Sequence, residues 1–242
     1  MSRILIIYYH EVVPDGCGSS YQKHDASKFE QEMRCLRERG YHTLLFSELN
    51  EPLPERSVIV SFDDGYQSVL QYAAPIMKQY GIKGNVYLPT GRIGASPEFM
   101  DWPEIETMRN SGDWYFAAHT HSHADIRTLT RESAAAEILQ STALFEQHLG
   151  YRPDVFCMPY GSFDRGSVKL IRELGGYRYL LGSFYGVADL DRADRTVLPR
   201  IGISNDDTLA DFEAKLDGKR NWKGPLQRAR LAYHNLFRRG GA

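Results

Sequence analysis

The chain alternates between short apolar runs and longer stretches in which apolar residues recur every three or four positions. Continuous apolar runs of strand length predict buried strands, whereas the 3.6-residue rhythm predicts amphipathic helices, here ended by glycines such as Gly40, Gly81 and Gly150. We expect strands at residues 4–9, 41–46, 58–62, 83–88, 114–118, 155–158, 179–181 and 197–203, and helices at residues 26–39, 67–80, 101–110, 130–149 and 164–174.

Strand and helix follow each other roughly every 25 to 35 residues, which is typical of βα units around parallel strands. The pattern therefore predicts a barrel-like α/β fold. In such barrels the active groups lie at the carboxyl ends of the strands. Four predicted strand ends carry polar groups of this kind: His10, Asp63 with Asp64, the histidines between His119 and His123, and Tyr160 after Pro159.

Composition adds limits to this picture. The 242 residues are 42% hydrophobic and 25% charged, and no low-complexity linker divides them, which favours one globular domain. The net charge of −2 argues against a nucleic-acid-binding protein. Residues 218–242 hold seven Lys or Arg and no acid, which leaves a net charge of −9 for residues 1–217. We expect a barrel domain at 1–217 and a basic helix at 218–242.

The apolar positions of the basic segment follow a helical rhythm from Pro225 onward, with arginines between them. The apolar positions are Leu226, Ala229, Tyr233, Leu236 and Phe237, and the arginines are Arg228, Arg230, Arg238 and Arg239. One interpretation is that the apolar face packs on the barrel. The alternative is weak contact with an anionic membrane surface, which basic amphipathic helices favour.

Cysteines and hydropathy bear on the compartment. Cys17, Cys35 and Cys157 are odd in number and widely spaced, which does not suit a disulfide framework. The first apolar run meets His10 too early for a signal peptide, and no run approaches transmembrane length. These features predict a cytoplasmic protein, or one peripheral to the membrane.

Asp63 and Asp64 end the most apolar strand and precede Gly65. Neighbouring residues at a strand end point in different directions, so one carboxylate can bind a cation while the other faces what the cation holds. Without a cation, mutual repulsion would raise the pKa of one of them. The alternative is a simple turn, because Asp and Gly are common turn residues.

Three residues separate His119 from His123, and the pair comes directly after a predicted strand. Together with one carboxylate they supply two nitrogens and one oxygen, and they leave positions open for water. That ligand set is typical of a catalytic metal site rather than a structural one. A lone pair at this spacing arises often by chance, but three histidines within five residues beside a strand-end Asp pair favour a metal site.

Three motifs together resemble those of the polysaccharide deacetylases of carbohydrate esterase family 4. They are Ser61-Phe62-Asp63-Asp64-Gly65, His119-Thr120-His121-Ser122-His123 and Pro159-Tyr160-Gly161, and the likeness extends from Tyr8-Tyr9-His10 through Trp102 to about Ile203. The resemblance implies a distorted (β/α) barrel and metal-dependent hydrolysis of an N-acetyl, or sometimes O-acetyl, group on a sugar. It also implies that Asp64, His119 and His123 are metal ligands and that Asp63 is the general base.

Further roles follow from the same resemblance. The backbone N–H of Tyr160 would stabilise the oxyanion, and His10 would be the general acid, the alternative being an ordinary strand-end histidine. Many family members have Arg two residues before the Pro-Tyr pair, where this chain has Cys157. Arg200, at another strand end, is the candidate replacement that would hold Asp63, the alternative being a surface salt bridge.

We therefore expect an enzyme that removes acetyl from an N-acetylated amino sugar in a poly- or oligosaccharide or a lipid-linked glycan. The expected cofactor is a divalent metal, zinc first, with cobalt or nickel as alternatives. Trp102, Tyr160 and Phe163 are candidate sugar-stacking residues or simple packing. Two other functions stay open: a catalytically weak metal- or carbohydrate-binding relative, and a hydrolase of another non-peptide C–N bond such as a cyclic amide.

Overall fold

The computed structural model describes residues 2–49 and 52–238. Its strands are β1 Arg3–Tyr9, β2 Glu11–Val13, β3 Lys23–Asp25, β4 His42–Thr43, β5 Ser57–Asp63, β6 Gly84–Leu88, β7 Trp114–Ala118, β8 Val155–Cys157, β9 Tyr179–Leu181, β10 Ala188–Asp189, β11 Val197–Leu198 and β12 Ile201–Gly202. Its α-helices are α1 Ala26–Glu38, α2 Ala74–Tyr80, α3 Trp102–Asn110, α4 Arg131–Leu149, α5 Arg165–Gly175, α6 Leu209–Leu216 and α7 Lys223–Arg238.

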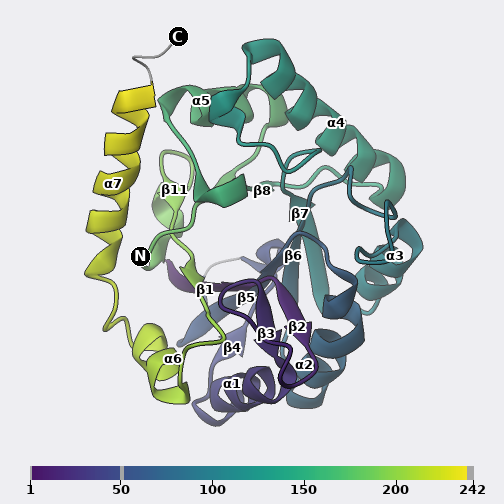
Figure 1. Ribbon diagram of the computed structural model, residues 1–242, viewed down its shortest axis with the longest axis vertical. Coiled ribbons are helices and arrows are strands. Elements are labelled where there is room, and N and C mark those ends of the chain that lie inside the picture. Colours follow the sequence, from purple (N-terminus) through teal and green to yellow (C-terminus); the bar gives the residue numbers. More distant parts are fainter. Residues whose placement is uncertain (1, 50–51, 239–242) are drawn as a thin grey trace.

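The main sheet is a nearly closed barrel of mostly parallel strands, as predicted. Its order is β1-β5-β6-β7-β8-β9-β11, and β12 pairs with β1 in parallel. β11 and β12 are neighbours in the chain, separated by Pro199 and Arg200, so this one segment joins β9 to β1 and closes the ring. Figure 1 shows the strands at the centre and α1 to α5 around them.

The buried residues form two clusters, and alternate residues along each strand belong to different clusters. Ile4, Ile6 and Ile59 belong to the smaller cluster, with Cys157 and Leu181, and this cluster fills the barrel interior. The intervening residues of the same strands belong to the larger cluster under the helices. Because side chains alternate across a strand, the sequence pattern fixes which residues face inward at each strand end.

Side-chain caps and glycines close several helix ends. The Asp101 side chain accepts from the Glu104 N–H at 2.9 Å, while Glu104 accepts from the Asp101 N–H at 2.9 Å, which closes a capping box at the start of α3. Thr130 caps α4 through the N–H of Ser133, and Gly150 ends it at φ 71°. These caps position the loops that enter and leave the strand ends.

The structure corrects some predicted elements. The strand expected at 41–46 is only two residues long, because the chain turns into a 3-10 turn at Phe46–Glu48. The helix expected at 67–80 begins as a π-helical turn, Val69–Ala73, before α2. The strand expected at 197–203 is split by Pro199, which has no N–H to donate to a ladder. β2, β3, β10 and α6 were not predicted.

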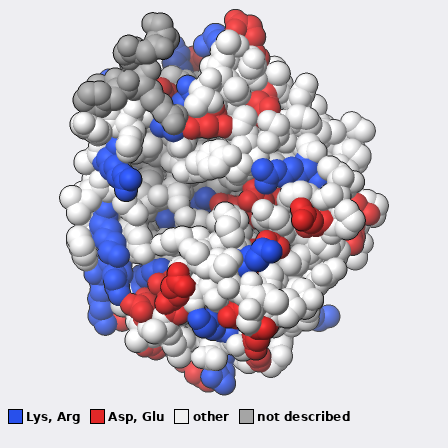
Figure 2. Space-filling view, in the orientation of Figure 1, with Lys and Arg blue, Asp and Glu red and all other residues white. Residues whose placement is uncertain are grey.

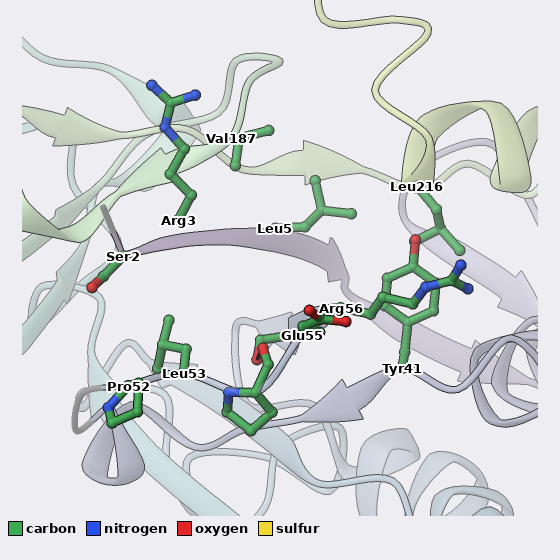
Figure 3. Close-up of a pocket in the computed structure, with 12 residues that line it drawn as sticks. Ser2, Arg3, Leu5, Tyr41, Pro52, Leu53, Glu55, Arg56, Val187 and Leu216 are labelled. Atoms are coloured by element: carbon green, nitrogen blue, oxygen red, sulfur yellow. Dashed lines mark hydrogen bonds between the residues drawn. The ribbon is translucent and has the colours of Figure 1, made fainter.

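A cavity of about 470 Å³ lies at the amino-terminal ends of β1 and β5 (Figure 3). Ser2, Arg3 and Leu5 line one side of it, and Glu55 and Arg56 line another. The predicted site residues are not among those lining it, since they lie at the opposite ends of these strands.

Candidate active site

The carboxyl ends of the strands bring most of the predicted site residues together. Asp63 is the last residue of β5 and points into the barrel, following Ile59 and Ser61 at a period of two. His119 follows β7 in the same inward register as Ala117, and Arg200 lies in the segment that closes the ring. All three are buried, with exposed fractions of 5% or less. Figure 2 shows a hollow in this face of the molecule with charged side chains inside it.

Arg200 and Asp63 form a buried, bidentate ion pair. Arg200 Nη1 donates to Asp63 Oδ1 at 2.6 Å and Nη2 donates to Oδ2 at 2.9 Å. The alternative of a surface salt bridge is wrong, because Arg200 is only 2% exposed. The guanidinium also lies over the rings of Tyr8 at 4.4 Å and Tyr87 at 5.2 Å, which favours the cation in this buried position.

The ion pair sets the charge state of Asp63. Burial alone would raise the pKa of this carboxyl, but the charge and hydrogen bonds of Arg200 outweigh it and lower the pKa to about 2. The Sγ atom of Cys157, two residues before the Pro159-Tyr160 pair, lies 3.9 Å from Asp63 Oδ1. Burial raises the pKa of the Cys157 thiol well above its ordinary value, so it stays protonated and donates to the carboxylate.

Asp64, His119 and His123 form a group that can hold a metal ion. Their ligand atoms all lie within 4.8 Å of one another. Asp64 Oδ1 lies 3.2 Å from His123 Nε2 and 4.0 Å from His119 Nε2. Zinc bonds of about 2.0–2.1 Å at tetrahedral angles place ligand atoms about 3.4 Å apart, so the 3.2 Å spacing suits a shared ion, and the 4.0 Å spacing would suit one after a small side-chain shift.

A hydrogen bond fixes the tautomer of His119 that leaves Nε2 able to bind a metal ion. Its Nδ1 lies 2.8 Å from the carbonyl oxygen of Cys157. A carbonyl only accepts, so Nδ1 carries the proton and Nε2 keeps a free lone pair toward Asp64. Burial lowers the pKa of His119, although the charges of Asp63 and Asp64 oppose the shift. Burial, followed by the charge of His119, likewise lowers the pKa of His123 to about 4. Both imidazoles are therefore neutral near pH 7, as metal ligands must be.

A second group, Asp63 with His119 and Cys157, also has ligand atoms within 4.8 Å of one another. One of its three ligand atoms is a protonated thiol, because burial raises the pKa of Cys157 well above its ordinary value. A thiol must lose its proton to bind metal. The Asp64 group therefore fits a metal ion better.

Local backbone strain marks the same residues. Asp64, Thr120, His123 and Tyr160 have φ between 60° and 73°, the left-handed region that side chains with a Cβ disfavour. They make up four of the six non-glycine residues with positive φ among residues 2–49 and 52–238. Such strain collects at functional sites. The turn interpretation of Asp63-Asp64-Gly65 is also correct as geometry, since the turn aims Asp64 at the histidines.

Two predicted residues lie at the rim. Tyr160, in the 3-10 turn Pro159–Gly161 after β8, is 71% exposed. Its ring and that of His123 are in a T-shaped contact, with ring centroids 4.8 Å apart. His10 follows β1 and is partly exposed, with Nδ1 3.0 Å from the carbonyl oxygen of Tyr21. Because that carbonyl only accepts, His10 Nδ1 carries a proton, and Nε2 is the nitrogen free to exchange one.

Several site residues were not predicted from the sequence. Glu137 on α4 accepts from the N–H groups of His121 and Ser122 at 2.9 and 2.7 Å, and so holds the loop between the two histidine ligands. Arg92, after β6, donates to Asp64 Oδ1 at 3.1 Å. Arg92 had a usable signal, because it follows a strand end as the predicted residues do. Glu137 had none, since it lies inside a helix.

Other candidates have packing roles. Trp102 stacks on His148, with ring centroids 4.4 Å apart and planes within 2° of parallel, and Phe163 contacts Phe184 at 6.1 Å. His121 lies with Nδ1 3.1 Å from Thr90 Oγ1, outside the ligand group. Of the three aromatic candidates, Tyr160 is the one exposed beside the histidines.

A small cavity of about 160 Å³ adjoins the ion pair on the side of Tyr8. Arg200 and Tyr8 line its inner wall, and Tyr21, Tyr185 and Gln227 line the outer part.

The barrel, the strand-end site and the neutral His-His-Asp group define the class of (β/α)-barrel hydrolases that depend on a metal ion. Comparison with known proteins gives the family. The polysaccharide deacetylase family model matches residues 50–180, which is more than half of the chain. The chain belongs to the polysaccharide deacetylase family and is a carbohydrate deacetylase of that metal-dependent family.

Individual relatives are distant. The Bacillus subtilis protein YxkH, whose name assigns it to the polysaccharide deacetylases, is 26% identical over 209 residues, which cover 84% of this chain and 72% of that protein. The poly-beta-1,6-N-acetyl-D-glucosamine N-deacetylase of Escherichia coli K12 is 22% identical over 87% of this chain. The chain spans only 38% of the length of that relative.

The structural comparison supports the fold. The Streptococcus pyogenes deacetylase PplD superposes with a TM-score of 0.80 at 20% identity, over 88% of this chain and 98% of that one. At this level of identity the likeness establishes the barrel fold, and the roles of residues rest on the geometry described above.

Proposed function

We propose that the protein removes the acetyl group from an N-acetylated amino sugar in a poly- or oligosaccharide or a lipid-linked glycan. The observation that carries the proposal is the pair of adjacent aspartates with separate partners: Asp64 faces two neutral imidazoles, and Asp63 is held by Arg200. The names of the Escherichia coli and Staphylococcus aureus relatives, poly-beta-1,6-N-acetyl-D-glucosamine N-deacetylases, support this substrate class.

In this proposal Asp64, His119 and His123 hold a divalent ion, zinc first, with cobalt or nickel as alternatives. Two imidazole nitrogens and one carboxylate oxygen suit zinc and leave coordination positions open. A bound ion of this kind lowers the pKa of water from about 15.7 to near 7 and polarises a carbonyl group.

The remaining steps fall to side chains and backbone of the chain. Asp63 accepts the proton of the attacking water, and Arg200 keeps its carboxylate ionised and oriented for that transfer. The backbone N–H of Tyr160 donates to the oxyanion that develops on the acetyl carbonyl. His10 gives the proton of its Nε2 to the departing amine, with the hydrogen bond from Nδ1 to Tyr21 fixing the ring.

The compartment remains a prediction. Cys17, Cys35 and Cys157 are free thiols, in line with the reducing compartment expected from their spacing. Within the described part of the chain, no helix has the length and apolar character that crossing a bilayer requires.

Acetate release from a panel of N- and O-acetylated saccharides, with and without a chelator, tests the proposal. We expect release from N-acetylated oligosaccharides, its loss with chelator and its return with added zinc. Metal uptake without acetate release from any saccharide would favour a binding relative. Turnover of a cyclic amide in place of the sugars would favour a hydrolase of another C–N bond.

A further inference from the structure

Helix α7 presents a stripe of apolar residues to solvent instead of to the barrel, whereas Leu231 on another side of the helix is half-buried. Leu226 is 62% exposed and Tyr233 is 59% exposed, and Ala229 between them is also exposed. Their spacing of three and four residues places them in one stripe on the helix. Trp222, in the turn just before α7, is 64% exposed. The expectation that this face packs on the barrel is therefore wrong for the described residues; Leu236 and Phe237 lie outside the described side chains.

The opposite side of α7 attaches the helix to the barrel through polar contacts. Gln227 Oε1 accepts from the Tyr185 N–H at 2.8 Å, and Asn235 Nδ2 donates to the Phe163 carbonyl at 2.9 Å. Gly224 approaches the Tyr185 carbonyl so closely that a Cβ would lie 2.0 Å from its oxygen. These contacts fix the rotation of the helix, so the apolar stripe points outward as part of the native fold.

Positive charge accompanies the exposed stripe. Lys223 and Arg230 lie beside Trp222 and Leu226 in the chain, as do Lys219 and Arg220, which pair with Asp217 and Asp211, and no acidic residue follows Asp217. Figure 1 shows α7 along the outer edge of the molecule, and Figure 2 shows basic side chains along that edge. An exposed apolar stripe flanked by cations matches the interface of an anionic bilayer, where the apolar side chains enter the acyl boundary and the cations meet the headgroups.

We propose that α7 is a docking surface for an anionic membrane. Trp222, Leu226 and Tyr233 insert into the interface, and Lys223 and Arg230 contact the headgroups. Gln227, on the inner side of the same helix, lines the cavity next to Arg200. A docked helix therefore brings the site beside the membrane surface, where a lipid-linked glycan would be within reach; this last step rests on the proposed function.

Co-sedimentation of the full chain with phosphatidylglycerol-containing vesicles tests the docking without measuring turnover. We expect binding at low salt that weakens at high salt, and little binding to pure phosphatidylcholine. The double variant Leu226→Ser with Tyr233→Ser should lose most of the binding. The matched control, Leu139→Ser with Tyr72→Ser, removes two exposed apolar residues elsewhere and should bind like the wild type.

A second pair of variants tests the contribution of positive charge to vesicle binding. Arg230→Gln should weaken binding to anionic vesicles about fivefold, because each basic residue near such a surface contributes a factor of that order. Arg131→Gln on α4, whose side chain is 69% exposed, removes an equal charge away from α7 and should leave binding unchanged.

The fluorescence of Trp222 can show whether its side chain enters the membrane interface. The other tryptophans are less exposed, at 7% for Trp114 and half-buried for Trp102, so lipid-borne bromine should quench mainly Trp222. The quenching should disappear in Trp222→Phe. A wild-type protein that ignores anionic vesicles at low salt overturns the proposal. A dimer that becomes a monomer in the Leu226→Ser, Tyr233→Ser variant, without vesicle binding, would instead make this stripe a contact between copies of the chain.

Discussion

Arg200 and Asp63 meet in a bidentate ion pair although they lie 137 residues apart in the chain. The arginine comes from the segment that closes the barrel, and the aspartate comes from the end of β5. Cys157, two residues before the Pro159-Tyr160 pair, contacts the same carboxylate through its thiol. The guanidinium that orients Asp63 therefore comes from the segment between β11 and β12, and it balances the charge of the carboxylate.

Loss of the Arg200 guanidinium should change both stability and pH dependence. In Arg200→Met the buried Asp63 carboxylate lacks its partner, which should lower the free energy of unfolding by about 3–5 kcal/mol. Burial then raises the pKa of Asp63, so the acid limb of the rate profile should move to higher pH. Denaturant unfolding and a pH–rate profile measure the two effects. An unchanged acid limb would mean that Arg200 does not set the charge of Asp63.

The same ion pair has a consequence for the wild-type protein in acid. The pKa of Asp63 is about 2 in the fold and 3.8 when unperturbed. Because the folded value is the lower one, the ionised carboxylate stabilises the fold at pH above 3.8, and this stabilisation is lost as the pH falls toward 2. The variant Asp63→Asn should lack this part of the acid dependence in unfolding measured between pH 4 and pH 2.

Replacing each of the two adjacent aspartates in turn should have different effects on metal binding and turnover. Asp63→Asn should keep the metal and lower turnover by about 10²-fold or more, since it removes the proposed general base. Asp64→Asn should lose metal, because only two imidazoles remain. Metal content by mass spectrometry and acetate release give both results. Metal loss in Asp63→Asn with retention in Asp64→Asn would reverse the assignment.

Glu137 should matter to the metal although it touches no ligand atom. Its carboxylate holds the backbone between His119 and His123 through two N–H groups. Removing such a supporting contact weakens metal binding by about 10- to 100-fold, and we expect that loss in Glu137→Ala. Glu146→Ala, an exposed change on the same helix, is the control. Equal metal affinity in the two variants would leave Glu137 with a structural role only.

Protons should compete with the metal only in acid. The pKa of His123 is lowered to about 4, and that of His119 is also lowered, so both imidazoles are neutral well below pH 6.5. Metal affinity, followed by competition with an indicator, should change little between pH 8 and pH 6 and fall steeply toward pH 4. A tenfold loss for each unit below pH 7 would show that the imidazoles titrate normally.

His10 should control the basic limb of the rate profile. The departing amine needs a proton, which His10 is proposed to give, so turnover should fall on the basic side of the profile. His10→Gln should lower turnover and remove that limb without affecting metal content. If this variant keeps the wild-type turnover and pH profile, His10 is an ordinary strand-end histidine and not the general acid.

The sequence predicted those parts of the structure that depend on local pattern. The apolar run at 58–62 placed Asp63 and Asp64 at a strand end, and Gly150 marked the end of α4. Residues joined by tertiary contact were harder to predict. Glu137 is one of several acids on α4, and only the packing of that helix against the histidine loop selects it.

The C-terminal helix shows the same limit. Its rhythm predicted an amphipathic helix, and α7 is one, but the pattern alone left open whether its apolar side packs on the barrel or faces a membrane surface. Polar contacts from Gln227 and Asn235 turn that side outward. Periodicity finds the stripe of a helix, whereas its orientation depends on partners elsewhere in the chain.

A zinc titration of metal-free protein, with bound metal and acetate release followed together on an N-acetylated oligosaccharide, tests the central claim most directly. The account predicts that both signals rise in parallel and saturate at one metal per chain, and that His119→Ala shows neither at the same zinc concentrations. Full acetate release from the metal-free protein, or a His119→Ala variant that binds zinc and turns over like the wild type, would contradict it.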